Sequence, residues 1–316
     1  MYMNITNHYN NITSNKLFFS GLAITGILLS HLIGVDENNL AWCIFYPGFV
    51  GVDIFLFYSG YGLCRSFERN TLREFYARRL KRIYPMLCIF TIATYAILHF
   101  LQHNDFTFFD VICNLTALNF WSIGGIKAEW YLCFIVYMYL LFPVLYLFIR
   151  KGNIWTIFIA FICLFTFLII HQDGWFYQCA FSRVPIFMLG ILCYQQNDAH
   201  TYTKGMLIFL VAFIIMTILF IGGIVQKFEL VYMAAPYILF ILAWGCKSII
   251  KKQARTFHII NFVGKYSLEI YVANMLILQI IPYLNFQIPI ALTYMGLHVL
   301  LVPVIVFINL FIQKKI

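Results

Sequence analysis

Residues 17–34 read LFFSGLAITGILLSHLIG. As an α-helix, this apolar stretch is long enough to cross the hydrocarbon core of a bilayer, which is about 30 Å thick. Its one ionisable side chain is His31, which lies about 20 Å along such a helix from Lys16. Ionisable groups at this depth usually face a bundle interior or a water-filled path. The stretch therefore predicts a membrane-spanning helix and makes His31 a candidate functional residue.

The same apolar pattern recurs along the whole chain. Of the 316 residues, 63% are hydrophobic and 10% are charged, whereas a soluble domain carries about 25% charged residues. We predict an all-α polytopic membrane protein with about ten transmembrane helices. A short polar tail at residues 1–16 precedes a single transmembrane domain at residues 17–316. The ten apolar segments lie at 17–34, 44–64, 83–101, 130–149, 154–171, 179–195, 206–224, 230–248, 259–281 and 289–312.

The distribution of basic residues sets the topology. With the N-terminus on the cytoplasmic side, 17 of the 21 Lys and Arg residues fall in the tails and inner loops, as the positive-inside rule requires. Both termini are therefore predicted to be cytoplasmic. The longest outer loop, at residues 102–129, is a candidate lid or substrate-contacting segment.

Four ionisable residues from four different predicted helices share one depth band in the outer half of the membrane. They are His31, Asp53, Glu129 and Arg183. This coincidence favours a shared polar cavity. The alternative is structural: Arg183 forms an ion pair with Asp53 or Glu129 that fixes helix packing, and His31 is a core histidine bonded to a neighbouring carbonyl.

A basic run at residues 65–82 follows the second apolar segment. Within it, Arg78, Arg79 and Arg82 place at least two guanidinium groups on one helix face, and arginine forks suit phosphates. The run is either an anion site for a phosphorylated cytoplasmic donor or only an inner loop that anchors the topology.

Other ligand classes have little support in the sequence. The formal net charge of +9 lies mostly in the inner loops, so no nucleic-acid partner is expected. The nine Cys are scattered, without a CxxC pair or a Cys/His cluster of zinc spacing. No metal site and no disulfide framework are predicted.

Two blocks of sequence resemble the bacterial acyltransferase-3 family, whose members are ten-helix membrane O-acyltransferases that modify glycans. They are GVDIFLFYSGY at residues 51–61 and FYARRLKRIYP at residues 75–85. Further matches, in the same order as in the family, are WYL at 130–132, RVPIFMLG at 183–190 and GKYSLEIY at 264–271. The resemblance covers the whole chain and is to the stand-alone membrane form.

The resemblance implies roles for individual residues. His31 matches a helix-1 histidine with the role of general base or acyl relay, and Asp53 matches the GVD aspartate. Arg79 and Arg82 match a cytoplasmic Arg-x-x-Arg element. Two positions depart from the family's pattern: Ser20 stands where an Arg usually lies eleven residues before the histidine, and Asn274 stands where many members carry His.

The resemblance also implies a reaction. An acyl group, often acetyl, moves from cytoplasmic acyl-CoA to a hydroxyl of a carbohydrate or lipid-linked acceptor in a bacterial cytoplasmic membrane. Acyl-CoA is then a donor substrate rather than a resident cofactor, and the other partners are the saccharide acceptor and membrane lipid.

The chemistry is consistent with these residues. His31 suits proton removal from the attacking hydroxyl near neutral pH, and Asp53 or Glu129 would orient the ring, as in a triad. The absence of a Gly-x-Ser-x-Gly motif favours direct transfer over an acyl-serine intermediate. The donor-binding candidates are Arg78, Arg79, Arg82 and Ser20. The candidates for substrate binding or oxyanion stabilisation are Arg183, Trp130, Tyr271 and Asn274.

Two other functions remain open at this stage. One is a non-catalytic transporter or exporter of a glycan or lipid-linked sugar, which the missing Arg at Ser20 favours. The other is a degenerate structural subunit, against which His31, Asp53 and the Arg-x-x-Arg element argue.

Overall fold

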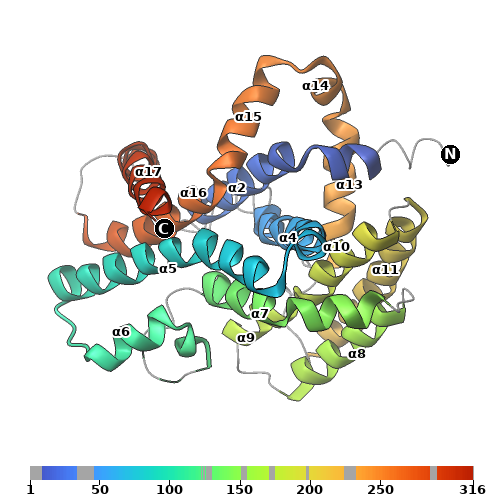
Figure 1. Cartoon of the computed structure of the whole chain (residues 1–316), viewed down its shortest axis with the longest axis horizontal. Coiled ribbons are helices and arrows are strands. Elements are labelled where there is room, and N and C mark those ends of the chain that lie inside the picture. The colour runs from blue at the N-terminus through green and yellow to red at the C-terminus, as the bar shows by residue number, and fades with distance from the viewer. Residues whose placement is uncertain are drawn as a thin grey trace. The chain divides into compact units, whose positions relative to one another are not determined.

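The computed structural model describes residues 9–33, 46–121, 123, 125, 130–150, 155–170, 175–196, 199–223, 233–284 and 290–315. Over these residues the chain consists of helices joined by turns, with no β-strand (Figure 1). It divides into two compact units. The first comprises Met1–Arg69 and Phe142–Lys265, and the second comprises Asn70–Leu141 and Tyr266–Ile316.

Helices of the first unit are mostly short and apolar. They are α2 (Lys16–Ile33), η1 (Tyr46–Phe49), α4 (Val50–Arg69), α8 (Trp155–Ile170), α9 (Trp175–Phe181), α10 (Val184–Gln196), α11 (Ala199–Ile221), α13 (Ala235–Gly245), α14 (Lys247–Lys252) and α15 (Arg255–Lys265). The second unit holds α5 (Leu72–Gln102), α6 (Phe108–Leu115), η2 (Leu118–Trp121), α16 (Ser267–Ile280), η3 (Ile281–Tyr283) and α17 (Ile290–Lys315). Helix α7 (Trp130–Arg150) contributes residues to both units.

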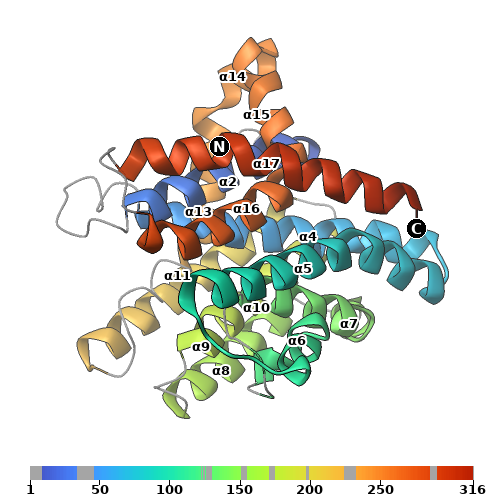
Figure 2. The ribbon, with the colours of Figure 1, turned by 90° about the vertical axis from the view of Figure 1, so that its left-hand side faces the viewer.

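The close contact of α4 with α10 forms the centre of the first unit (Figures 1 and 2). A Cβ atom at Gly60 would overlap the carbonyl oxygen of Phe187, and one at Gly190 would overlap the carbonyl oxygen of Phe57. Small residues let apolar helices approach to backbone contact, and the resulting van der Waals packing is one of the forces that associate helices in lipid. This contact therefore depends on the absence of a side chain at both glycines.

Helix α2 packs against α4, and the chain runs in opposite directions in the two helices. The ring of Phe19 stacks on that of Tyr58, and further along α2 the backbone of Ala23 lies where a Cβ of Gly51 would be. Because the position along α4 falls as the position along α2 rises, the two helices are antiparallel. The C-terminal end of α2 thereby lies beside the first turn of α4.

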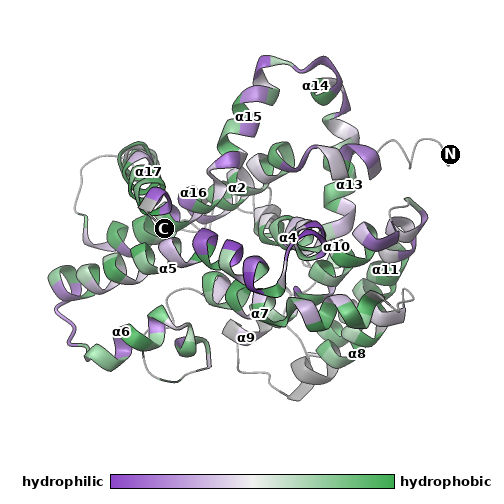
Figure 3. Cartoon of the chain, viewed as in Figure 1, coloured by the Kyte–Doolittle hydropathy of each residue, from purple (hydrophilic) through white to green (hydrophobic). Residues whose placement is uncertain are grey.

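In the second unit, α5 begins with a capping box. The side chain of Thr71 accepts a hydrogen bond from the backbone N–H of Glu74, and the Glu74 carboxylate accepts one from the backbone N–H of Thr71. This arrangement satisfies backbone donors that have no partner within the helix. Hydrophilic residues occupy the first turns of α5, and hydrophobic ones cover most of α7 and α17 (Figure 3).

Helices α16 and α17 lie side by side in the second unit (Figure 2) and are joined by two polar pairs. The hydroxyl of Tyr294 donates to Asn274 Oδ1. The Asn309 amide donates to Glu269 Oε1 over 2.7 Å. Hydrogen bonds between apolar helices fix their rotation and register.

Between α5 and α7 the chain folds back along α5 as α6 and η2. The side chain of Asp110 accepts hydrogen bonds from the Thr107 hydroxyl at 2.6 Å, the Gly125 N–H at 2.8 Å and the Thr107 N–H at 2.8 Å. These donors, led by the Thr107 side chain, hold the pKa of the Asp110 carboxyl below its ordinary value. The carboxylate both caps α6 and ties Gly125 to its start.

Four helices of the described residues are long and apolar enough to cross a membrane. They are Leu72–Gln102, Trp130–Ile149, Ala199–Ile221 and Ala291–Lys314. Shorter apolar helices lie at Lys16–Leu32, Trp155–Leu164, Ala235–Gly245 and Ser267–Tyr283. The all-helical class is confirmed, and ten crossings with both termini cytoplasmic stay predictions.

Three expected segments are broken within the described residues. The segment predicted at 179–195 divides into α9 and α10 at Ser182 and Arg183, the one at 230–248 into α13 and α14 at Cys246, and the one at 259–281 into α15 and α16 at Tyr266. The first break has a direct cause. Pro185 has no N–H, so a continuous helix would leave the carbonyl group of Phe181 without its partner four residues on.

Substitution at the α4–α10 contact tests its role. Gly190→Ala is expected to destabilise the protein by about 1–3 kcal/mol, because the added methyl group forces two backbones apart. The matched control is Gly296→Ala in α17, where no atom lies within 4 Å of the position of the added Cβ. The control should be neutral or up to about 1 kcal/mol more stable, through helix propensity. Thermal unfolding in detergent measures both, and equal midpoints would contradict the close contact.

Candidate active site

His31 lies in the last turn of α2, fifteen residues after Lys16. Its half-buried ring meets that of Phe49 edge to face, with the centroids 5.6 Å apart. Phe49 ends η1, and α4 begins at the next residue. The imidazole therefore lies beside the start of α4.

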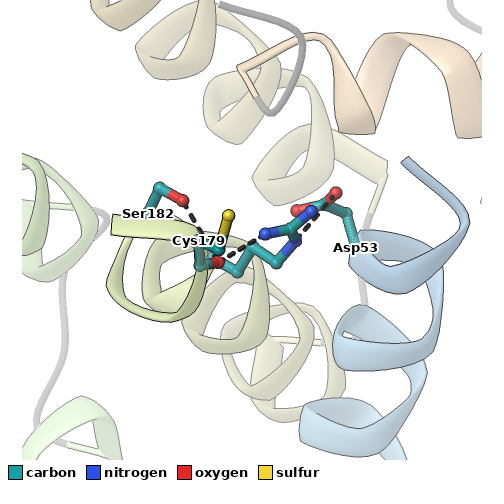
Figure 4. A network of polar contacts seen from close by, with 4 residues as sticks. Asp53, Cys179 and Ser182 are labelled. Atoms are coloured by element: carbon teal, nitrogen blue, oxygen red, sulfur yellow. Dashed lines mark hydrogen bonds and ion pairs between the residues drawn. The ribbon is translucent and has the colours of Figure 1, made fainter. Parts of the chain in front are cut away.

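Asp53 lies in the first turn of α4 and is completely buried. Its Oδ2 atom lies 3.4 Å from Arg183 Nε, and the side chains of both partners are at most 2% exposed. Figure 4 shows the Asp53 carboxylate reaching from α4 toward the α9–α10 turn. The structure thus forms one of the two ion pairs that the sequence left open.

Arg183 is held from a second side by its own turn. Its Nη1 donates to the carbonyl oxygen of Cys179, in the last turn of α9, and Ser182 Oγ donates to the same oxygen over 3.4 Å (Figure 4). The sequence placed Arg183 four residues inside a helix, and this is wrong. It lies in the two-residue turn before α10, because Pro185 ends the continuous helix. The turn directs the guanidinium toward α4.

Ser20 lies on α2, eleven residues before His31, and is 4% exposed. At 1.5 Å per residue the two side chains are separated by about 16 Å along the helix. Ser20 and His31 therefore lie in different parts of the first unit. A role for Ser20 in donor binding stays a prediction.

The remaining described candidates for substrate binding lie in the second unit. Trp130 begins α7, and its ring lies near that of Tyr131. The ring of Tyr131 meets that of buried Tyr271 at a centroid distance of 5.1 Å. Asn274, one turn further along α16, is completely buried and accepts the hydrogen bond from Tyr294. These residues form a cluster of aromatic rings with one buried amide.

The three arginines lie in the first three turns of α5. Arg78 and Arg82 are exposed. Arg79 is half-buried, and its guanidinium carbon lies 6.0 Å from the centroid of the Phe75 ring. The helix therefore presents two adjacent exposed guanidinium groups, at positions i and i+4, with a third beside them.

The structure thus unites some of the predicted residues. Asp53 and Arg183 are in contact, and His31 lies beside the start of the helix that carries Asp53. Glu129 lies outside the described residues. The aromatic cluster and the arginines are each described within the second unit.

Some contributing groups were missed by the sequence reasoning. The Cys179 carbonyl is a backbone group, for which the sequence holds no signal. Tyr294, by contrast, precedes His298 by one helical turn in an apolar segment, and these two polar residues together are a detectable signal. Their rings lie 4.4 Å apart.

A family model described as an acyltransferase domain matches residues 20–312. The chain belongs to the acyltransferase-3 family. A protein of the Acidianus two-tailed virus, ORF330, carries the name of an acetyltransferase and is 25% identical over 138 residues. That match spans 40% of this chain and 38% of the viral protein's length. No solved structure shows a significant match.

The matched range contains Asp53 and Arg183. It also contains the three arginines of α5 and the aromatic cluster of the second unit. It also includes His31. Membership of an acyltransferase family, together with helices apolar enough to span a membrane, indicates a membrane acyltransferase.

Double substitution tests the ion pair in this acyltransferase. Asp53→Asn and Arg183→Gln should each destabilise the protein by about 3–5 kcal/mol, because each leaves one buried charge without its counterpart. The double variant should lose less than the sum of the two, since neither charge remains. Thermal unfolding in detergent gives the coupling, with exposed Asp105→Asn as the control. Additive losses would contradict a direct interaction.

Proposed function

We propose that the protein is a membrane O-acyltransferase that moves an acyl group, in the first instance acetyl, from cytoplasmic acyl-CoA to a hydroxyl of a cell-surface or lipid-linked glycan. The observation that carries the proposal is the place of His31. It is a titratable group at the end of α2, its ring against Phe49 just before the helix that carries the buried Asp53, in a chain of an acyltransferase family.

In the proposed reaction, His31 accepts the proton of the acceptor hydroxyl as its oxygen attacks the thioester carbonyl carbon. A C–O bond forms, the C–S bond breaks, and the proton passes from the imidazolium to the leaving sulfur, which gives the acyl ester and CoA. The partly buried location of His31 supports this role, because burial keeps the imidazole neutral and so able to accept a proton.

We assign Asp53 and Arg183 a positioning role. Both are almost completely buried and are held against each other, and Arg183 also donates to a backbone carbonyl. Such a pair fixes the first turn of α4, against which α2 presents His31. Direct catalytic roles for Asp53 and Glu129, and an oxyanion role for Arg183, stay predictions.

The two groups of the second unit are assigned to the substrates. Arg78, Arg79 and Arg82 supply the charge that suits the phosphates of acyl-CoA. Trp130, Tyr271 and Asn274 supply apolar rings and an amide, a combination typical of small-molecule sites. The proposed location is the bacterial cytoplasmic membrane, where a cytoplasmic donor and a lipid-linked acceptor are both within reach.

The general-base role is tested by His31→Ala. Loss of a general base lowers the rate by about a hundredfold to ten-thousandfold, measured as transfer of label from acetyl-CoA to membrane-derived saccharide. The matched control is His200→Ala, at an exposed histidine in the first turn of α11. The control should retain the wild-type rate, and both variants should be equally abundant in the membrane.

Full activity in His31→Ala would refute the assignment of the base. If the wild-type protein neither binds acetyl-CoA nor releases CoA in the presence of saccharide, the alternative of a non-catalytic sugar transporter is favoured instead.

The donor site is tested by Arg79→Gln/Arg82→Gln. Loss of two charge-assisted contacts should raise the apparent KM for acyl-CoA roughly tenfold or more, with little change in the KM for the acceptor. Lys251→Gln/Lys252→Gln in α14 removes the same charge elsewhere and is the control. Equal effects of the two double variants would mean that the arginines serve only to anchor the membrane topology.

A further inference from the structure

The segment that follows α5 carries an exposed apolar surface although it lies outside the candidate membrane spans. On α6, Phe108 is 79% and Phe109 is 58% exposed. We call the set of outward-facing residues the α6 apolar face. Its members are Phe108, Phe109, Ile112, Leu118, Trp121 and Ile123. Monomeric soluble proteins rarely expose a contiguous apolar patch of this size unless the patch binds a partner or a membrane.

The opposite side of the segment is anchored to α5, so the apolar face cannot turn inward. The Tyr95 hydroxyl donates to Asn114 Oδ1 over 3.1 Å, and the Tyr95 ring lies 4.5 Å from that of Phe106. Cys113 and Asn114, on the anchored side of α6, are buried. The helix is thus amphipathic, and its orientation is set by these contacts.

The apolar face is almost without charge. Within residues 106–123 the sequence contains one charged residue, Asp110, whose carboxylate is bound to Thr107 and Gly125. The face carries Phe108, Phe109 and Trp121, and Trp, Phe and Leu are the side chains typical of the apolar face of interfacial helices. This composition fits a lipid surface better than it fits water.

The face also follows directly on a candidate membrane span whose own surface is exposed and apolar. Helix α5 is a candidate span, and on its C-terminal half Ile92 is 64% and Phe100 is 73% exposed. Helix α5 ends at Gln102, His103 adopts a left-handed conformation, and α6 begins at Phe108. Five residues, 103–107, therefore separate the end of the span from the start of α6, and α6 packs against α5 (Figure 1).

We propose that the α6 apolar face is a membrane-binding surface, whose aromatic side chains insert into the leaflet that meets the C-terminal end of α5. The segment is then an interfacial helix of the monotopic kind, lying in the plane of the membrane, and not a loop in water. The proposal is independent of the reaction that the protein catalyses.

Photocrosslinking in the full-length protein tests the proposal. The photoreactive residue p-benzoylphenylalanine replaces Phe109 in one variant and Asn104, in the exposed turn before α6, in the control. Both variants are reconstituted in vesicles of phosphatidylethanolamine and phosphatidylglycerol and irradiated, and the intact mass is measured. The substitution at Phe109 preserves the aromatic ring, and unchanged thermal midpoints show that both variants fold.

The expected result is a mass increase of one phospholipid at position 109, with a yield several-fold above that at position 104. A crosslinked dimer would mean that a second copy of the chain covers the face. Irradiation without any mass increase, together with an internal crosslink, would mean that another part of the chain covers it. Equal lipid yields at the two positions would mean that the face has no special contact with lipid. Each of these three results overturns the proposal.

Discussion

A charge that is surrounded by apolar side chains must have an opposite charge beside it, and the first unit is organised around one such pair. Asp53 and Arg183 are nearly inaccessible to solvent, and neither would be tolerated there alone. Their contact joins the first turn of α4 to the turn before α10. Seven residues further along each helix lie Gly60 and Gly190, where the two backbones touch.

A third contact completes the register of these two helices. Near the ends of α4 and α10, the Tyr194 hydroxyl donates to Glu68 over 2.8 Å, and Tyr146 of α7 donates to the same carboxylate. The order of the three contacts shows that α4 and α10 run in the same direction. Helix α2 is then packed antiparallel on α4, which brings His31 to the level of the ion pair. The place of the proposed base thus follows from contacts made by other helices.

Much of the fold class could be predicted from the sequence because lipid imposes strong rules. Long apolar runs with few charges leave little choice other than helices, and an ionisable residue within them is costly enough to mark a site. The ion pair was foreseen only as one of two options, since depth restricts which residues can meet but helix rotation decides which of them do. Rotation depends on contacts such as that of Gly51 with Ala23, and a single sequence does not state which glycine faces which helix.

Other features could not be foreseen for different reasons. The turn at Arg183 was missed because the hydropathy of a segment holds no information about its backbone hydrogen bonds. Pro185, two residues later, was a usable signal. The partner of Asn274 comes from α17, 20 residues away, and the choice of Tyr294 depends on how α16 and α17 are rotated. The division of apolar runs into shorter helices is likewise set by turns, which composition does not reveal.

The capping box at Thr71 has a consequence for the arginines that follow it. A helix turns by about 100° per residue, so the residue at which α5 begins determines the direction of every side chain after it. With Thr71 and Glu74 fixing the start, Phe75 is buried and Arg78 and Arg82 point outward. A start displaced by one residue would rotate all of them by a quarter turn or more. The uncharged hydroxyl of Thr71 therefore helps to set the direction in which the arginine side chains of the helix point.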